Sequence, residues 1–96
     1  MIRQGDLFFI PCKNIPLEAI VQQDGIIARG EVTGHTHRIS TGKAFLMLCA
    51  GIAYVRAETE ALIGHEEHKP VTLPPGNWLV KRQREYQPQG WRQIAD

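Results

Sequence analysis

Charge of one sign, cysteine and long apolar runs are all scarce in this sequence. Its 96 residues include 11 Lys and Arg against 10 Asp and Glu, a formal net charge of +1. No electrostatic argument therefore favours nucleic acid or an anionic membrane as a partner. The two cysteines are too few for the dense disulfide framework of a small secreted protein.

Membrane and export signals are missing as well. The longest apolar-rich window, residues 44–55, is too short to span a bilayer and is interrupted by Gly51. The polar N-terminal residues are not followed by the apolar stretch of a signal peptide. We therefore expect a cytoplasmic protein with no membrane partner. Cys12 and Cys49 lie in apolar runs, and we expect both to be buried free thiols.

Short apolar segments, separated by single Pro and Gly residues, make up most of the chain. They predict strands at 7–10, 19–21, 26–28, 35–40, 44–49, 52–56, 71–73 and 77–86. Asp24-Gly25 and Ala50-Gly51 each predict a hairpin. No window has a sustained helical apolar stripe, and only 56–62 is helix-tolerant. The sequence predicts one all-β domain over residues 1–96, a small barrel or barrel-like sandwich of about 7–8 short strands.

The four histidines fall in two pairs, and this is the strongest functional signal. Residues two apart on a strand share a face, so His35 and His37 can aim at one point. A turn before Lys69-Pro70 would bring His65 and His68 together. Imidazole is a common ligand of divalent transition metals. The pairs predict one polar site at which these histidines bind zinc, iron, nickel or manganese.

The histidine spacing matches no established metal motif. The histidines of the second pair are one residue too close for the HExxH motif of zinc peptidases. The first pair has the HxH of cupins, but the glutamate that cupins place shortly afterwards is missing. A metal-free polar site and unrelated surface histidines therefore stay open as alternatives.

Three charged residues are candidate catalytic groups around such a site. Glu31 or Glu67 would act as a base on metal-bound water, or would orient a ligand histidine. Arg84, with Arg82 as the alternative in the same run from Lys81 to Tyr86, would clamp an anionic substrate. Together they predict a metal-dependent hydrolase of the phosphoester type. The plain alternative for each is a solvated surface charge.

Several sequence blocks carry a family resemblance. They are Gln4-Gly5-Asp6, GEVTGHxH at 30–37, HEEH at 65–68, LPPG at 73–76 and RQREY at 82–86. In these blocks, and over nearly its whole length, the chain resembles an uncharacterised family of small bacterial proteins. The resemblance implies a bacterial or phage-like origin and a shared site built from the blocks, but no activity.

A second class of function stays open as the alternative. The chain can be a non-enzymatic binding or assembly module whose histidines form a structural hydrogen-bond hub. An exposed sheet edge would then recruit a partner protein or a second copy, giving a homo-oligomer. The sequence leaves open whether the protein is an enzyme and whether it acts on a small molecule.

Overall fold

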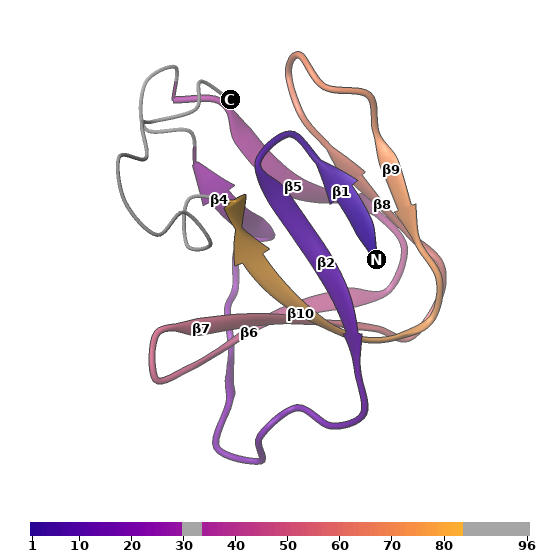
Figure 1. The fold of residues 1–96 in the computed structure, drawn as a ribbon. Helices are drawn as coiled ribbons and strands as arrows, with labels where there is room; N and C mark the ends of the chain where they lie inside the picture. Colours follow the sequence, from indigo (N-terminus) through magenta and orange to yellow (C-terminus); the bar gives the residue numbers. More distant parts are fainter. Residues whose placement is uncertain (30–33, 84–96) are drawn as a thin grey trace.

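Two antiparallel sheets, packed face to face, form the part of the chain that the computed structural model describes, residues 1–29 and 34–83 (Figure 1). The strands are β1 (Ile2–Gln4), β2 (Leu7–Cys12), β3 (Ile20–Val21), β4 (Ile26–Arg29), β5 (Thr36–Thr41), β6 (Ala44–Cys49), β7 (Ile52–Ala57), β8 (Ala61–Gly64), β9 (Val71–Leu73) and β10 (Gly76–Arg82). The larger sheet has the order β1-β2-β10-β7-β6-β3, and the smaller has the order β4-β5-β8-β9. The predicted all-β sandwich is confirmed, and its sheets are not closed into a barrel.

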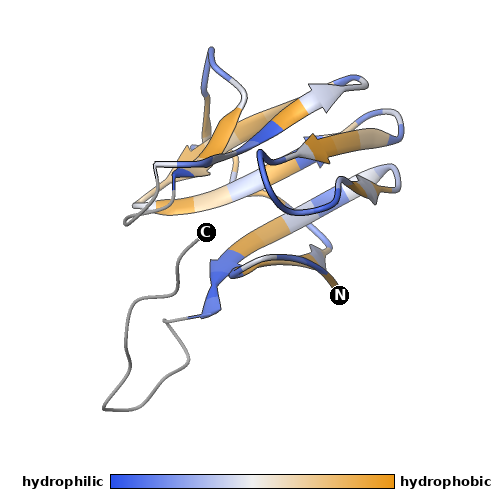
Figure 2. Ribbon diagram, turned by 90° about the horizontal axis from the view of Figure 1, so that it is seen from above, coloured by the Kyte–Doolittle hydropathy of each residue, from blue (hydrophilic) through white to orange (hydrophobic). Residues whose placement is uncertain are grey.

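Alternation of side chains along the strands builds the core between the sheets. Leu7 and Phe9 of β2 are fully buried, and Trp78 of β10 packs beside them. Apolar segments, orange in Figure 2, occur on strands of both layers. The core residues contributed by the two sheets are Leu7, Phe9, Val55, Ala57, Ala61, Ile63, Leu73 and Trp78. The indole Nε1 of Trp78 donates to the carbonyl of Pro74, which satisfies its polar atom.

Of the two predicted hairpins, the structure contains one. β6 and β7 pair across Ala50-Gly51, whose φ angles of 51° and 78° are both positive, as a tight two-residue hairpin turn requires. The hairpin expected at Asp24-Gly25 is wrong, because β3 pairs with β6 while β4 pairs with β5. The Asp24-Gly25 segment instead carries the chain from one sheet to the other.

The structure has more strands than the sequence predicted. β1 was not expected because Arg3 and Gln4 interrupt its apolar pattern, yet it pairs with β2 around the turn at Gly5. Residues 56–62 contain no helix; they form the end of β7, a bend and the start of β8. The edge strand β1 lies against β9 of the smaller sheet, which joins the two layers along one side (Figure 1).

The predicted free thiols are only half-buried. Cys12 and Cys49 are both free and of intermediate exposure, and burial raises the pKa of Cys12. Among the described residues, no helix is long and apolar enough to cross a membrane.

Candidate functional site

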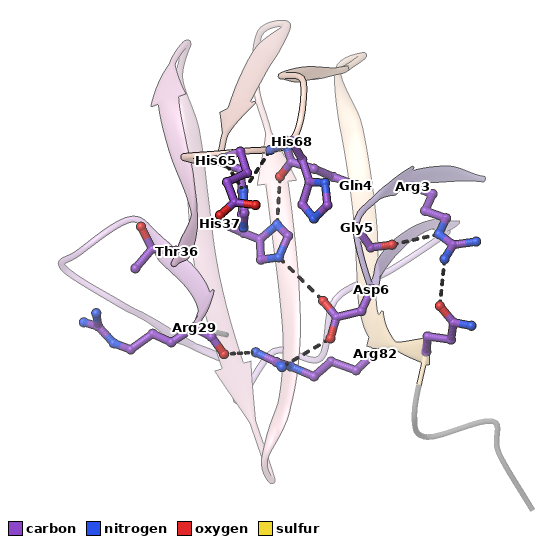
Figure 3. Close-up of polar contacts among 12 residues, drawn as sticks. Arg3, Gln4, Gly5, Asp6, Arg29, Thr36, His37, His65, His68 and Arg82 are labelled. Atoms are coloured by element: carbon purple, nitrogen blue, oxygen red, sulfur yellow. Dashed lines mark hydrogen bonds and ion pairs between the residues drawn. The ribbon is translucent and has the colours of Figure 1, made fainter. Parts of the chain in front are cut away.

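The structure places the four imidazole rings next to one another between β5 and the β8–β9 loop. β5 pairs with β8, and Arg38 lies opposite Gly64, so the residues before Arg38 lie beside those after Gly64. The ring centroid of His65 is 4.5 Å from that of His37, 4.4 Å from that of His68 and 5.5 Å from that of His35. Figure 3 shows three of the rings, with His65 and His68 above His37.

Gln4 of β1 determines which nitrogen of His37 carries a proton. Its amide nitrogen donates to the carbonyls of Ile63 at 2.9 Å and Lys69 at 3.0 Å. The amide oxygen therefore faces Nδ1 of His37, 2.8 Å away. Because an amide oxygen only accepts, Nδ1 of His37 must be the donor. The imidazole is fully buried, and this contact with the opposite sheet places a proton on Nδ1.

Asp6 and Arg82 continue this contact across the sandwich. Nε2 of His37 faces Oδ1 of Asp6 at 3.6 Å, and both side chains are buried. Arg82 lies 3.3 Å from the other carboxylate oxygen of Asp6 and also donates to the carbonyl of Arg29 in β4. A polar network thus links the β8–β9 loop, β1, β5, β10 and β4 (Figure 3). We call Gln4, Asp6, His37 and Arg82 the inter-sheet network.

His65 has a different role, because its Nδ1 is an acceptor. The backbone N–H groups of Glu67 and His68 both donate to it, each at 3.0 Å. This is the arrangement of a side-chain cap on a turn, and it holds the loop in its bend. A neutral imidazole whose Nδ1 accepts carries its proton on Nε2. In His65 the ring proton is therefore on Nε2.

The two loop glutamates contact the start of β5. Glu66 accepts from the backbone N–H of Thr36 at 2.8 Å and lies 3.4 Å from the guanidinium of Arg38. The hydrogen bond from the Thr36 backbone N–H, followed by that from the Glu66 backbone N–H and then by the Arg38 charge, lowers the pKa of Glu66 to about 2. Glu67 lies 3.3 Å from Nδ1 of His35. Both contacts tie the loop to β5 near the surface.

Of the three predicted catalytic residues, the structure describes only Glu67. Glu67 contacts His35, whereas Glu31 and Arg84 lie outside the described residues. Within residues 1–29 and 34–83, no group of three or more His, Cys, Asp or Glu side chains is arranged to hold a metal ion. The hydrogen bonds give one reason. A histidine that ligates through Nε2 carries its proton on Nδ1, but Nδ1 of His65 accepts two backbone N–H groups.

Sequence reasoning missed three members of the inter-sheet network. Gln4 and Asp6 appeared only within the resemblance block Gln4-Gly5-Asp6, and Arg82 only within the RQREY block and as the alternative to Arg84 for an anion clamp. Nothing in the local sequence shows that Gln4 is 2% exposed and Asp6 3% exposed. A buried polar side chain usually has a specific partner, so burial is the signal that identifies these residues.

A cleft lies beside the network, between the two sheets. Its volume is about 350 Å³, and its walls include Leu7 and Val80 of the larger sheet and Ile27 of the smaller. Arg82 lines one end, with its guanidinium turned toward Asp6 and Arg29. The cleft therefore combines apolar residues of both sheets with two cations, Lys81 and Arg82.

Fold and site together define an all-β sandwich domain with a buried polar network between its sheets. The chain belongs to the DUF8820 family, described as a domain of unknown function, whose model matches residues 3–83. The match includes every residue of the inter-sheet network and all four histidines. No curated protein and no solved structure matches the chain.

Proposed function

We propose that this domain is a non-catalytic binding or assembly module in which the histidines are a structural hydrogen-bond hub. One observation carries the proposal. The ring of His37 is 0% exposed, and its two nitrogens face Gln4 and Asp6 of the other sheet. A nitrogen that holds the fold together is not presented to a substrate.

The energetics of burial favour this role. A buried polar atom without a partner costs about 1–3 kcal/mol, so each contact between Gln4, His37 and Asp6 constrains the others. The network spans both sheets at the end where β1 meets β9. It therefore fixes the relative placement of the layers and leaves recognition to the outer surfaces.

A metal-dependent phosphoester hydrolase is the second candidate function. The proximity of the rings favours it, since His65 lies within 5.5 Å of its three neighbours when centroids are compared. His35, His37, His65 and His68 would hold the ion, with Glu31 or Glu67 as the base and Arg84 as the anion clamp. In this candidate, His65 must first release the two backbone N–H groups that it accepts if it is to ligate through Nε2.

Metal content separates the two candidates. Full-length protein is purified without added metal and analysed by inductively coupled plasma mass spectrometry. Its melting temperature is then compared with and without EDTA, and again after addition of zinc or manganese. We expect substoichiometric metal and an unchanged melting temperature.

A double variant, His35→Ala with His65→Ala, serves as the comparison. Stoichiometric metal in the parent that is lost in the double variant, with a melting temperature lowered by EDTA, would contradict the structural hub and support the hydrolase. An exposed substitution, Gln23→Ala, controls for changes introduced by purification. It should match the parent in both measurements.

A further inference from the structure

The cleft between the sheets opens where β10 runs past the end of β7. Within the described chain, β10 pairs with β7 as far as Val80 and Ala53, but with β2 as far as Arg82. Lys81 and Arg82 therefore extend beyond the β7 pairing, and both line the cleft. The tip of the β6–β7 hairpin forms one wall of this notch, and β4, which lies beside the end of β10, forms another (Figure 1).

The cleft leads from solvent to the apolar core. Ile52, at the hairpin, is 44% exposed, whereas Leu7, on the inner wall, is 0% exposed. Val80 and Ile27 line the cleft from opposite sheets, and both pack against the core. The cleft volume of about 350 Å³ lies at the lower end of the range of about 300–1,000 Å³ for small-molecule sites. This size favours a compact ligand.

The charged residues that line the cleft are cationic. Among the described residues of its walls, Lys81 and Arg82 are charged and none is Asp or Glu. Asp6 lies 3.3 Å from Arg82, so this pair is close to neutral and Lys81 supplies the net charge of the cleft. Apolar walls with a cationic end favour an anion that has an apolar part, because each half of such a molecule meets a matching surface.

The inter-sheet network holds Arg82 in place at the end of the cleft. The Arg82 side chain is 16% exposed, and its guanidinium lies between the carboxylate of Asp6 and the carbonyl of Arg29 (Figure 3). These two contacts use one N–H of each terminal nitrogen, and a guanidinium has further N–H groups. A guanidinium that is already fixed loses less conformational freedom when it donates to an anion.

We propose that the cleft binds a small organic acid, whose apolar part lies between Ile27 and Val80 and whose carboxylate meets Lys81 and Arg82. The inference rests on the proposed binding role and names the class of ligand. An ammonium and a guanidinium both form charge-assisted hydrogen bonds to a carboxylate. Because Arg82 also contacts Asp6, the ligand site is joined to the inter-sheet network.

Phenylbutyrate is a suitable probe, because it carries one carboxylate on a compact apolar body. Titration of the ¹⁵N-labelled full chain, followed by ¹H–¹⁵N correlation spectra, locates the site through the amide shifts of Gly51, Ala53 and Lys81. We expect saturable shifts there, with a dissociation constant on the order of 100 μM to 1 mM. Phenylbutyramide, which has the same size but no charge, should bind about fivefold more weakly. Acetate, which lacks the apolar part, should not saturate the site.

Two variants remove the two halves of the proposed site. Ala53→Phe places a ring in the cleft and should weaken phenylbutyrate binding about tenfold or more. Lys81→Gln keeps most of the side-chain length but removes the charge, so it should weaken binding about fivefold. The affinity of the parent should fall as the NaCl concentration rises, and this salt dependence should be smaller in Lys81→Gln.

Each variant has a matched control. Ala44→Phe makes the same substitution in a separate hollow beside β5 and β6. Lys43→Gln removes a cation from an exposed position outside the cleft. Both controls should bind phenylbutyrate as the parent does. Circular dichroism checks that every variant folds, and Lys81→Gln provides the test if Ala53→Phe does not fold.

Several outcomes would overturn the inference. They are the absence of saturable shifts at the cleft at millimolar phenylbutyrate, equal binding of the acid and the amide, and binding that folded Ala53→Phe or Lys81→Gln leaves unchanged. Shifts confined to the β8–β9 loop would place the anion at the histidines and would equally contradict the cleft. A metal-free protein that does not bind phenylbutyrate refutes the ligand site but leaves the structural hub standing. Stoichiometric metal contradicts the hub whatever the titration shows.

Discussion

Replacing Gln4 with methionine removes the central amide of the inter-sheet network and keeps a side chain of similar length. Gln4 is 2% exposed and makes contacts of 2.9, 3.0 and 2.8 Å to Ile63, Lys69 and His37. The variant leaves two carbonyls and one ring N–H without this partner. At about 1–3 kcal/mol for each buried group, and less for the part-buried Lys69 carbonyl, the loss is about 3–6 kcal/mol.

That loss is large for a domain of this size. A chain of 96 residues is expected to be stable by about 5–15 kcal/mol. Urea denaturation followed by circular dichroism gives the free energy of unfolding for the parent and the Gln4→Met variant. The control is Gln22→Met, because the side-chain amide of Gln22 donates to the nearby exposed carbonyl of Ile20. It should cost less than about 0.5 kcal/mol. A Gln4→Met loss below about 1 kcal/mol would refute a structural network.

Three further predictions concern other parts of the structure. The pKa of Glu66 is lowered from its usual 4.5 to about 2, so its stabilising ionised form is fully present above the usual value and is lost as the pH falls through about 2. The melting-temperature difference between the parent and Glu66→Gln should therefore shrink from neutral pH toward pH 2, and a constant difference would count against the Thr36 contact. Ala50 has a φ of 51°, and Ala50→Asn should raise the unfolding free energy by about 0.5–1 kcal/mol in urea, since asparagine tolerates this conformation; a loss would contradict the turn geometry. Gly42→Ala combines a φ of 96° with a clash against the Glu60 carbonyl and should cost about 3 kcal/mol or more in urea, whereas Gly51→Ala meets no neighbour within 4 Å and should cost about 1–2 kcal/mol from backbone strain alone. Equal losses at the two glycines would disprove the clash.

Local patterns were sufficient for the fold class but not for the pairing of the strands. The apolar runs of β2 and β6 and the Ala50-Gly51 turn are short-range signals, and the structure has them where they were expected. Asp24-Gly25 also has the composition of a hairpin turn. The chain there changes sheets, because β3 and β4 find better partners in β6 and β5. Competition between distant strands cannot be derived from a dipeptide.

The candidate site, like the fold, could be predicted only as far as local sequence patterns determine it. Pairing of the histidines in the sequence pointed to a shared location, and the ring distances follow from the β5–β8 register. Their chemistry depends on partners that are far away in the chain, since Gln4 and His37 are 33 positions apart. The sequence alone could not reveal the hydrogen bonds that occupy Nδ1 of His65. The assignment of the histidines as metal ligands stays a prediction until metal content is measured.

The tautomers of His37 and His65 test the structural hub most directly. Long-range ¹H–¹⁵N correlation spectra of uniformly labelled protein at neutral pH report which ring nitrogens carry protons, with His37→Gln and His65→Gln used for assignment. We expect a proton on Nδ1 of His37 and an unprotonated, hydrogen-bonded Nδ1 on His65. A proton on Nδ1 of His65, or an unprotonated Nδ1 on His37, would contradict the account.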